Sequence, residues 1–267
     1  MRRLTLLGTV VALVAMALPG SALAAKPGAG TCTGGTMADG TYDGGFTVTG
    51  TCTIAYGAHV QINGDLTIVD GASLDDHGAE APWAQAAEMH ITGNVYVGKG
   101  AVLGLGYNAD EASLGPDTVG GSIIANQPLA LQLGNVTVDG NVISNGGGVL
   151  STSIDDFRNF PVKDNVIHGN LIIQGWQGGW IGLIRNQVDG NVVFANNVSM
   201  SNPETGPGTD EDSSEVMGSS VFGLSFPQTI GGNLICHGNV PAAHVNVGDF
   251  GDYNVVSGKK IGECAGL

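Results

Sequence analysis

The sequence has few charged residues and very few basic ones. Charged residues make up 12% of the 267, and the 9 Lys and Arg face 24 Asp and Glu, so the formal net charge is −15. A globular chain usually carries about 25% charged residues. Because such an acidic chain repels phosphate backbones and anionic lipid headgroups, the composition argues against nucleic-acid binding and against attachment to a membrane surface.

Familiar catalytic motifs are also lacking. The sequence contains no nucleophile elbow, phosphate-binding loop or dinucleotide fingerprint, and its 6 His are scattered without metal-ligand spacing. We therefore expect no resident cofactor, with calcium as the one ion to consider. Disorder is excluded by the 42% of hydrophobic residues, which is more apolar side chain than a disordered chain leaves in water.

The N-terminus has the pattern of a secretory signal peptide over residues 1–24. Arg2 and Arg3 precede an apolar run over residues 4–18, and the segment ends on small residues around Ala24. An uncleaved N-terminal anchor is the alternative. No second apolar run reaches the roughly 20 residues that a membrane span needs. We expect residues 25–267 to be one extracellular or cell-surface domain.

Four cysteines lie near the two ends of the expected mature chain. In an exported protein an even number of cysteines indicates disulfides, and four allow three connectivities. We favour the two local pairs, Cys32 with Cys52 and Cys236 with Cys264. Neither pair has the short spacing of a zinc knuckle, so we expect no zinc site.

A short phrase recurs along the chain and indicates a repeat. It consists of an aliphatic residue, any residue, Gly, then Asn or another small polar residue, and a second aliphatic residue, as in Ile167-His168-Gly169-Asn170-Leu171. Internal repeats of this length are typical of solenoids. The phrase glycines are Gly64, Gly93, Gly121, Gly140, Gly169, Gly190, Gly232 and Gly258.

The spacing of these glycines predicts a parallel β-helix. The intervals are 29, 28, 19, 29, 21, 42 and 26 residues, and with 42 counted as two turns the mean is about 24. Alternating Val and Ile between the phrases favour strands over helices. We predict an all-β, single-domain, right-handed parallel β-helix of about nine or ten turns over residues 31–264, with the disulfides at its ends.

The phrase itself predicts a corner between strands. The two aliphatic residues should point into a continuous core, and the Asn side chains should stack into a hydrogen-bonded ladder from turn to turn. Gly and Asn both tolerate the left-handed backbone conformation, which we expect at this bend. The corner asparagines are therefore interpreted as structural residues, not as ligands or catalysts.

Several stretches resemble a family of exported, uncharacterised β-helix proteins of actinobacteria. They are residues 98–106 (GKGAVLGLG), 157–161 (FRNFP) and 175–180 (GWQGGW), and the closing stretch from 232–239 to 258–264 near the C-terminus. The resemblance covers almost the whole mature chain. It implies the fold and the exported location, and it brings no activity or functional residue with it.

Four segments break the repeat and are expected to be loops outside the coil, where solenoids often carry function. They are residues 75–89, 108–117, 151–164 and 203–215. The last is the most polar, and we interpret it as a solvated loop. Asp210 and Asp212 are its calcium candidates, although their spacing matches no calcium-loop signature.

The best candidate for chemistry lies in and beside residues 151–164. Asp155, Asp156, Arg158 and Lys163 supply the carboxylates and bases that a polysaccharide lyase would need, and paired carboxylates would equally suit a glycoside hydrolase. An ordinary surface ion-pair arrangement is the other interpretation. The acidity of the chain also opposes binding of a polyuronate.

Two tryptophans follow in the next turn. Trp176 and Trp180 could present two rings on an outer face to a sugar, or they could pack as an aromatic corner, and packing is favoured. If a functional site exists, we expect it on this outer face with Arg158 and Lys163, and not in the Gly-Asn corners.

The sequence leaves two roles open. The favoured one is a secreted or cell-envelope protein without catalytic activity, which presents loops to a cell-wall polymer, a polysaccharide or a surface protein, or assembles with itself. The alternative is a carbohydrate-active enzyme, either a polysaccharide lyase or a glycoside hydrolase, that acts on extracellular polysaccharide. Products formed from a polysaccharide panel would distinguish them.

Overall fold

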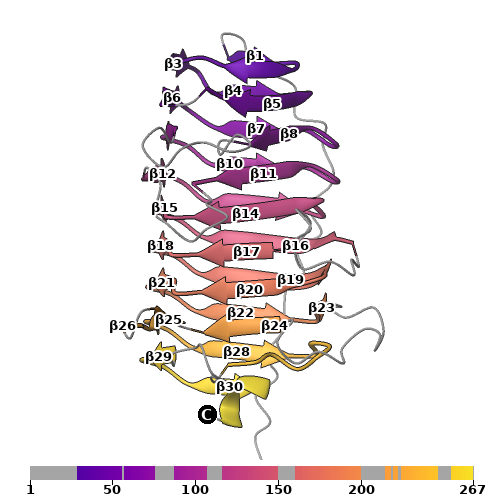
Figure 1. Cartoon of the computed structure of the whole chain (residues 1–267), viewed down its shortest axis with the longest axis vertical. Helices are drawn as coiled ribbons and strands as arrows, with labels where there is room; N and C mark the ends of the chain where they lie inside the picture. The colour runs from indigo at the N-terminus through magenta and orange to yellow at the C-terminus, as the bar shows by residue number, and fades with distance from the viewer. Residues whose placement is uncertain are drawn as a thin grey trace, which may run out of the picture.

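The chain winds as a parallel β-solenoid. The structure, a computed structural model, describes residues 29–55, 57–75, 87–106, 116–149, 160–199, 214–217, 219–221, 224–245 and 254–266. Successive turns place strands in three long sheets, here called A, B and C. Figure 1 shows the turns stacked in one column, from β1 (Gly30–Cys32) at one end to β30 (Lys260–Gly262) and the C-terminus at the other. The predicted β-helix is confirmed.

Sheet A contains ten strands in successive turns, and the short strand β23 (Val198–Ser199) also pairs with one of them, β19 (Leu171–Gly178). In spatial order they are β1 (Gly30–Cys32), β4 (Phe46–Val48), β7 (Leu66–Ile68), β10 (Val95–Val97), β13 (Ile123–Asn126), β16 (Val142–Gly148), β19 (Leu171–Gly178), β22 (Val192–Ala195), β28 (Leu234–His237) and β30 (Lys260–Gly262).

Sheets B and C complete each turn, and the paired strands between turns are parallel. Sheet B consists of β2 (Gly35–Met37), β5 (Thr51–Ile54), β8 (Ser73–Asp75), β11 (Val102–Leu105), β14 (Ala130–Gly134), β17 (Phe160–Lys163), β20 (Ile181–Ile184) and β24 (Ser214–Met217). Sheet C consists of β3 (Gly40–Asp43), β6 (His59–Asn63), β9 (Glu88–Ile91), β12 (Asp117–Val119), β15 (Val136–Val138), β18 (Val166–Ile167), β21 (Gln187–Val188), β27 (Gln228–Ile230) and β29 (Asn254–Val256).

Two further elements lie outside these sheets. A small antiparallel hairpin joins β25 (Ser219–Val221) to β26 (Leu224–Phe226), and a 3-10 helix, η2 (Glu263–Gly266), closes the described chain. None of the described residues form a helix that is both long and apolar enough to cross a membrane.

The core is built from the alternating residues of the three sheets. The phrase lies at the corner where sheet C leads into sheet A, and its two aliphatic residues point inward as predicted. Ile167 and Leu171, for example, are both 0% exposed. Since paired strands of successive turns lie about 4.8 Å apart, these inward side chains form one continuous apolar column.

The 42-residue interval is one turn, not two, which corrects the expected average period. β22 pairs directly with β28, with Val192 opposite Leu234, although Gly190 and Gly232 are 42 residues apart. The basic turn is therefore the one seen in the 19-residue interval between Gly121 and Gly140. Longer intervals contain insertions between strands, and an insertion leaves the strand register intact. The average interval is therefore longer than the basic turn.

The reason for glycine at the phrase also differs from the expectation. Of the eight phrase glycines only Gly64 has a positive φ, of 140°. The others are needed because the turns pack closely at this corner: a Cβ atom on Gly169 would lie 2.5 Å from the carbonyl oxygen of Gly140. The left-handed non-glycine residues lie instead at the ends of sheet A and sheet B strands, at Gln127, Asn135, Asp164, Arg185 and Asn196.

The predicted ladder of corner asparagines is present. The Oδ1 atom of Asn141 accepts hydrogen bonds from the backbone N–H and the Nδ2 of Asn170, at 2.8 and 2.9 Å. Asn170 accepts the same pair from Asn191, and Asn191 accepts it from Asn233. These partly buried amides therefore fix the stacking of four turns at one corner.

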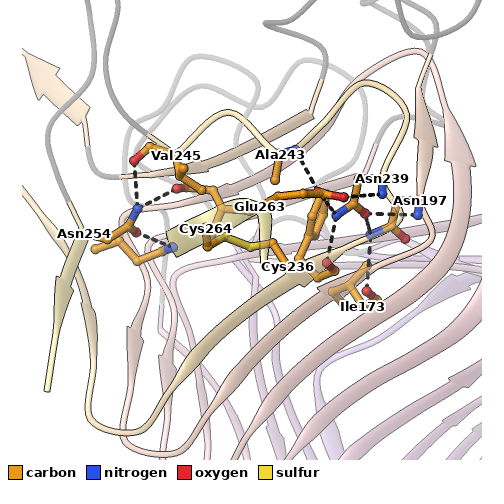
Figure 2. Close-up of a disulfide and its surroundings, with 12 residues drawn as sticks. Ile173, Asn197, Cys236, Asn239, Ala243, Val245, Asn254, Glu263 and Cys264 are labelled. Carbon is orange, nitrogen blue, oxygen red and sulfur yellow. Dashed lines mark hydrogen bonds between the residues drawn. A yellow bond between two sulfur atoms is a disulfide. The ribbon is translucent and has the colours of Figure 1, made fainter. Parts of the chain in front are cut away.

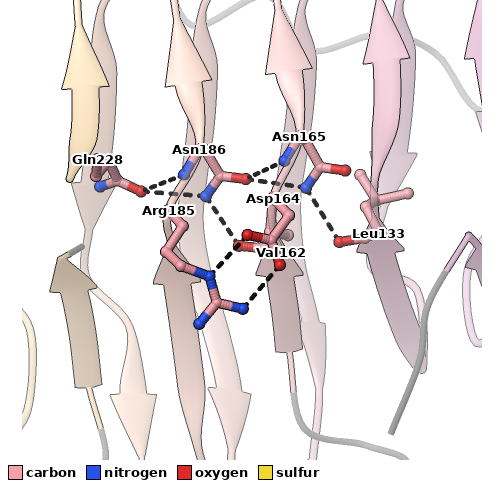
Figure 3. A network of polar contacts seen from close by, with 7 residues as sticks. All are labelled: Leu133, Val162, Asp164, Asn165, Arg185, Asn186 and Gln228. Atoms are coloured by element: carbon pink, nitrogen blue, oxygen red, sulfur yellow. Dashed lines mark hydrogen bonds and ion pairs between the residues drawn. The ribbon is translucent and has the colours of Figure 1, made fainter. Parts of the chain in front are cut away.

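A second ladder lies inside the coil, where sheet B leads into sheet C (Figure 3). The Nδ2 of Asn186 donates to the carbonyl of Val162 at 2.8 Å and to Gln228 Oε1 at 3.1 Å, and its Oδ1 accepts from Asn165 Nδ2 at 2.9 Å. Asn165 in turn donates to the carbonyl of Leu133 at 3.0 Å. These buried amides are satisfied by one another and by the backbone, as buried polar groups require.

A third ladder ends at the C-terminal turn (Figure 2). Asn197 donates to Asn239 Oδ1 at 3.0 Å, and Asn239 donates through Nδ2 to Glu263 Oε2 at 2.8 Å. The Glu263 carboxylate also accepts from the backbone N–H of Asn239 and of Ala243. This side chain therefore takes the place of the asparagine that a further turn would supply.

Both local disulfides are formed, as predicted. Cys32 is bonded to Cys52 in the first turns, and Cys236 in β28 is bonded to Cys264 in η2. They tie down the two ends of the solenoid, where an open strand edge offers unpaired backbone to other chains.

Candidate functional site

Most of the predicted site residues lie outside the part of the chain that the structure describes. This holds for the acidic and basic candidates Asp155, Asp156 and Arg158, and for the calcium candidates Asp210 and Asp212. Their shared site therefore stays a prediction. The described candidates are Lys163, Trp176 and Trp180. Within the described residues, no three His, Cys, Asp or Glu side chains are grouped in a way that could hold a metal ion.

Trp176 is a core residue. It lies in β19 at the end of sheet A, is 0% exposed, and its backbone N–H donates to Asn197 Oδ1 at 2.9 Å. Its ring occupies the space beside Gly147 and Gly148 in the turn before, where a Cβ atom would lie 2.7 to 2.8 Å from ring atoms. The packing interpretation therefore applies to Trp176, and a platform of two outward rings is not formed.

Trp180 lies on the outer face of sheet B. Its ring covers Gly182, and a side chain at that glycine would overlap with the ring. The Nζ of Lys163, in the neighbouring strand β17, lies 5.2 Å from the centre of the Trp180 ring. A cation this close to an aromatic face is attracted by the ring quadrupole. The arrangement therefore places one positive charge and one aromatic ring together on this face.

A second basic side chain nearby is tied to the fold. Arg185 donates through Nε and Nη2 to the two carboxylate oxygens of Asp164, each at 2.7 Å. Both residues have positive φ values, 58° and 59°, at the corner after sheet B. The Arg185 side chain is only 7% exposed, so this bidentate pair is interpreted as a corner brace and not as a ligand site.

The four segments that break the repeat are all joined to strands of sheet B. Residues 76–86 and 107–115 follow β8 and β11, at the edge of sheet B where its strands end. Residues 150–159 and 200–213 precede β17 and β24, at the edge where its strands begin. The outer face of sheet B, with Lys163 and Trp180 on it, therefore lies between the attachment points of all four segments.

An exposed histidine between two aspartates was missed by the sequence analysis. His168 Nδ1 lies 2.7 Å from Asp189 Oδ2 of the next turn. This hydrogen bond raises the pKa of His168 above 6.5, and the negative charges of Asp189 and Asp139 contribute further to the increase. The sequence contains a signal for this cluster, because Asp139, His168 and Asp189 occupy the variable position before Gly in successive phrases. The prediction used only the constant positions of the phrase.

Comparison with protein-family models, with curated proteins and with solved structures finds no significant match.

Proposed function

We propose that the protein is a secreted or cell-envelope scaffold without catalytic activity, as the chain's resemblance to exported β-helix proteins also suggests. In this proposal the solenoid is a rigid rod. It holds the segments joined to sheet B against a cell-wall polymer, a polysaccharide or a surface protein.

The placement of the insertions supports this proposal. Four insertions in four different turns all join the same sheet, two at each of its edges. If insertions were retained only because they do not disturb the fold, they could occur at any of the three corners of a turn, since each turn of a solenoid contacts only its neighbours. Their common placement favours a single composite surface over sheet B.

The remaining polar groups support a structural role for the rest of the coil. The buried amides form ladders that are saturated by hydrogen bonds within the coil, as for Asn186 and Asn239. The two disulfides fit an oxidising compartment outside the cytoplasm. Stability of this kind suits a protein that works outside the cell.

The test is binding to insoluble envelope material from the producing cells, measured by cosedimentation. A variant that lacks residues 150–159 shortens the interval between Gly140 and Gly169 from 29 to 19 residues, the interval already present between Gly121 and Gly140. We expect it to fold and to bind about tenfold more weakly or worse, which corresponds to about 1.4 kcal/mol.

The matched control leaves every insertion in place and changes the outer face of sheet C instead. Val166→Thr introduces the residue that the same column already contains at Thr137, and binding should be unchanged. Equal binding by both variants, or no binding by the native chain, would overturn the proposal. New reducing ends or unsaturated uronates from a polysaccharide panel, with or without calcium, would establish the enzyme alternative.

A further inference from the structure

The outer face of sheet A carries an apolar ridge. The middle residue of each sheet A strand points outward. It is Thr31, Thr47 and Thr67 in the first three strands and Tyr96 in β10. From β13 onward the same position is aliphatic in six successive strands of the sheet. At the last of these turns the side chain is 41% exposed. The ridge consists of Ile124, Ile143, Ile172, Val193, Ile235 and Ile261.

The columns on both sides of the ridge are without formal charge over five turns. On one side lie the ladder residues of the phrase corner, and on the other lie short polar or small residues that face the same way. This is notable in a chain with 24 acidic residues. The flanking positions are Ser122, Asn141, Asn170, Asn191 and Asn233, and Asn126, Asn145, Gln174, Ala195 and His237.

We infer that this face is a self-association surface, which binds a second copy of the same chain through the apolar ridge. A twofold axis that lies in the interface plane, parallel to the strands and midway between β19 and β22, places Ile172 of one copy against Val193 of the other. Ile143 then meets Ile235, and Ile124 meets Ile261. The ridge is thus self-complementary, as a twofold interface requires.

The charge of the molecule favours a second copy as the occupant. Elsewhere the excess of acidic residues makes two copies repel each other. On the ridge, and on its flanks over these five turns, an approaching copy meets only residues without formal charge. At the sixth turn Lys259 continues the ladder column, and the twofold arrangement places it against Ser122 of the other copy, so burial brings no like charges into contact. A basic partner protein would gain nothing at this face, since it offers no carboxylates over these five turns.

The available area fits a reversible dimer. Six strands about 4.8 Å apart and five residues wide, at about 3.3 Å per residue, bury about 950 Å² over both copies. This is near the lower limit for specific interfaces, where transient complexes are found. We therefore expect a dissociation constant of about 10 to 100 μM. The inference concerns a different sheet from the proposed function and does not depend on it.

The experiment is sedimentation velocity of the purified, disulfide-intact chain over a concentration series around that range. The native chain should shift from the mass of one copy to that of two. Ile172→Lys should weaken the association by about tenfold or more, because an unpaired ammonium would be buried at the centre of the interface. The added positive charge reduces the net repulsion between copies, so a nonspecific electrostatic effect would strengthen the association and not weaken it.

Two further variants keep the result interpretable. Ile172→Thr places in the ridge a residue that the same column already contains at Thr47 and Thr67, so it should fold normally and still weaken the dimer. Val166→Lys makes the matched change on the outer face of sheet C and should have no effect. A native chain that stays monomeric throughout, because another part of the chain or another partner covers the ridge, would overturn the inference. So would equal weakening by Ile172→Lys and Val166→Lys.

Discussion

At the scale of single residues, two asparagines in one turn of the coil differ in what surrounds them. Asn186 lies inside, is 0% exposed and takes part in hydrogen bonds with Val162, Gln228 and Asn165. Asn170 lies at the partly buried corner, where water can replace a lost amide. A buried group left without its partner has no such replacement.

We therefore predict that Asn186→Ala lowers the free energy of unfolding by about 3 kcal/mol and Asn170→Ala by about 1 kcal/mol. Chemical denaturation of the two variants, followed by circular dichroism, measures the difference. Equal losses, or a larger loss for Asn170→Ala, would show that burial does not set the contribution of these ladders.

A second residue-scale prediction concerns His168. Its pKa is raised first by the hydrogen bond to Asp189 and further by the charges of Asp189 and Asp139. Because the folded pKa exceeds the unfolded value of about 6.5, the stabilising contribution is complete below that pH. It is lost as the pH rises through the folded pKa.

An NMR titration of the imidazole measures this effect. Asp189→Asn should lower the pKa of His168 towards its ordinary value, because the partner of the charged hydrogen bond is removed. Asp139→Asn should lower it less, since Asp139 acts only through its charge. An unchanged pKa in Asp189→Asn would contradict the assignment of the hydrogen bond as the main cause.

At the scale of elements, the disulfide between β28 and η2 restrains the last turn. The bond links Cys236 to Cys264 across 28 residues and holds β30 and Glu263 in place. A cross-link that closes a loop of this size contributes about 3.6 kcal/mol in the chain-entropy model. In a solenoid each turn contacts only its neighbours, so the effect of removing it should stay local.

The double variant Cys236→Ser/Cys264→Ser should therefore fray at the C-terminus first. Trypsin should cleave it at Lys259 or Lys260, which the native chain protects within and beside β30. The matched variant Cys32→Ser/Cys52→Ser should keep these sites resistant. Mass spectrometry identifies the cleavage sites, and faster cleavage than in the native chain at Lys163 or Arg185, in the central turns, would contradict a local effect.

Elements also show how far the sequence predicts this fold. The corner between sheets C and A was predicted because the same phrase recurs there with its aliphatic residues at fixed positions. The other two corners were not, because they contain different residue types with positive φ, such as Gln127 and Arg185, and they receive the insertions. Single buried amides such as Asn186 carry no local pattern that separates them from surface residues.

The candidate site was predicted less well, for a related physical reason. Trp176 and Trp180 are four residues apart, but β19 ends between them at Gly178, so one ring enters the core and the other covers sheet B. Sequence spacing predicts a shared face only within one strand. The position of a corner between the two residues decides which side of the coil each ring occupies.

At the scale of the whole molecule, charge and apolar surface are separated on the rod. The net charge is −15, yet the ridge on sheet A and its flanking columns carry no formal charge over five turns. Long-range repulsion between copies and short-range attraction along the ridge therefore oppose each other. The salt concentration changes their balance, because it screens the first and leaves the second.

We predict that sodium chloride strengthens the self-association. Sheets packed face to face lie about 10 Å apart, close to the Debye length of about 10 Å at 0.1 M salt, which falls to about 3 Å at 1 M. The dissociation constant from sedimentation equilibrium should therefore decrease between low salt and about 0.5 M. The dissociation constant of the Ile172→Thr variant should also decrease with salt, but from a higher value, since the net charge of the variant is unchanged. An interface held by ion pairs would weaken with salt, so that opposite trend would place the contact on a charged face of the solenoid and not on the ridge.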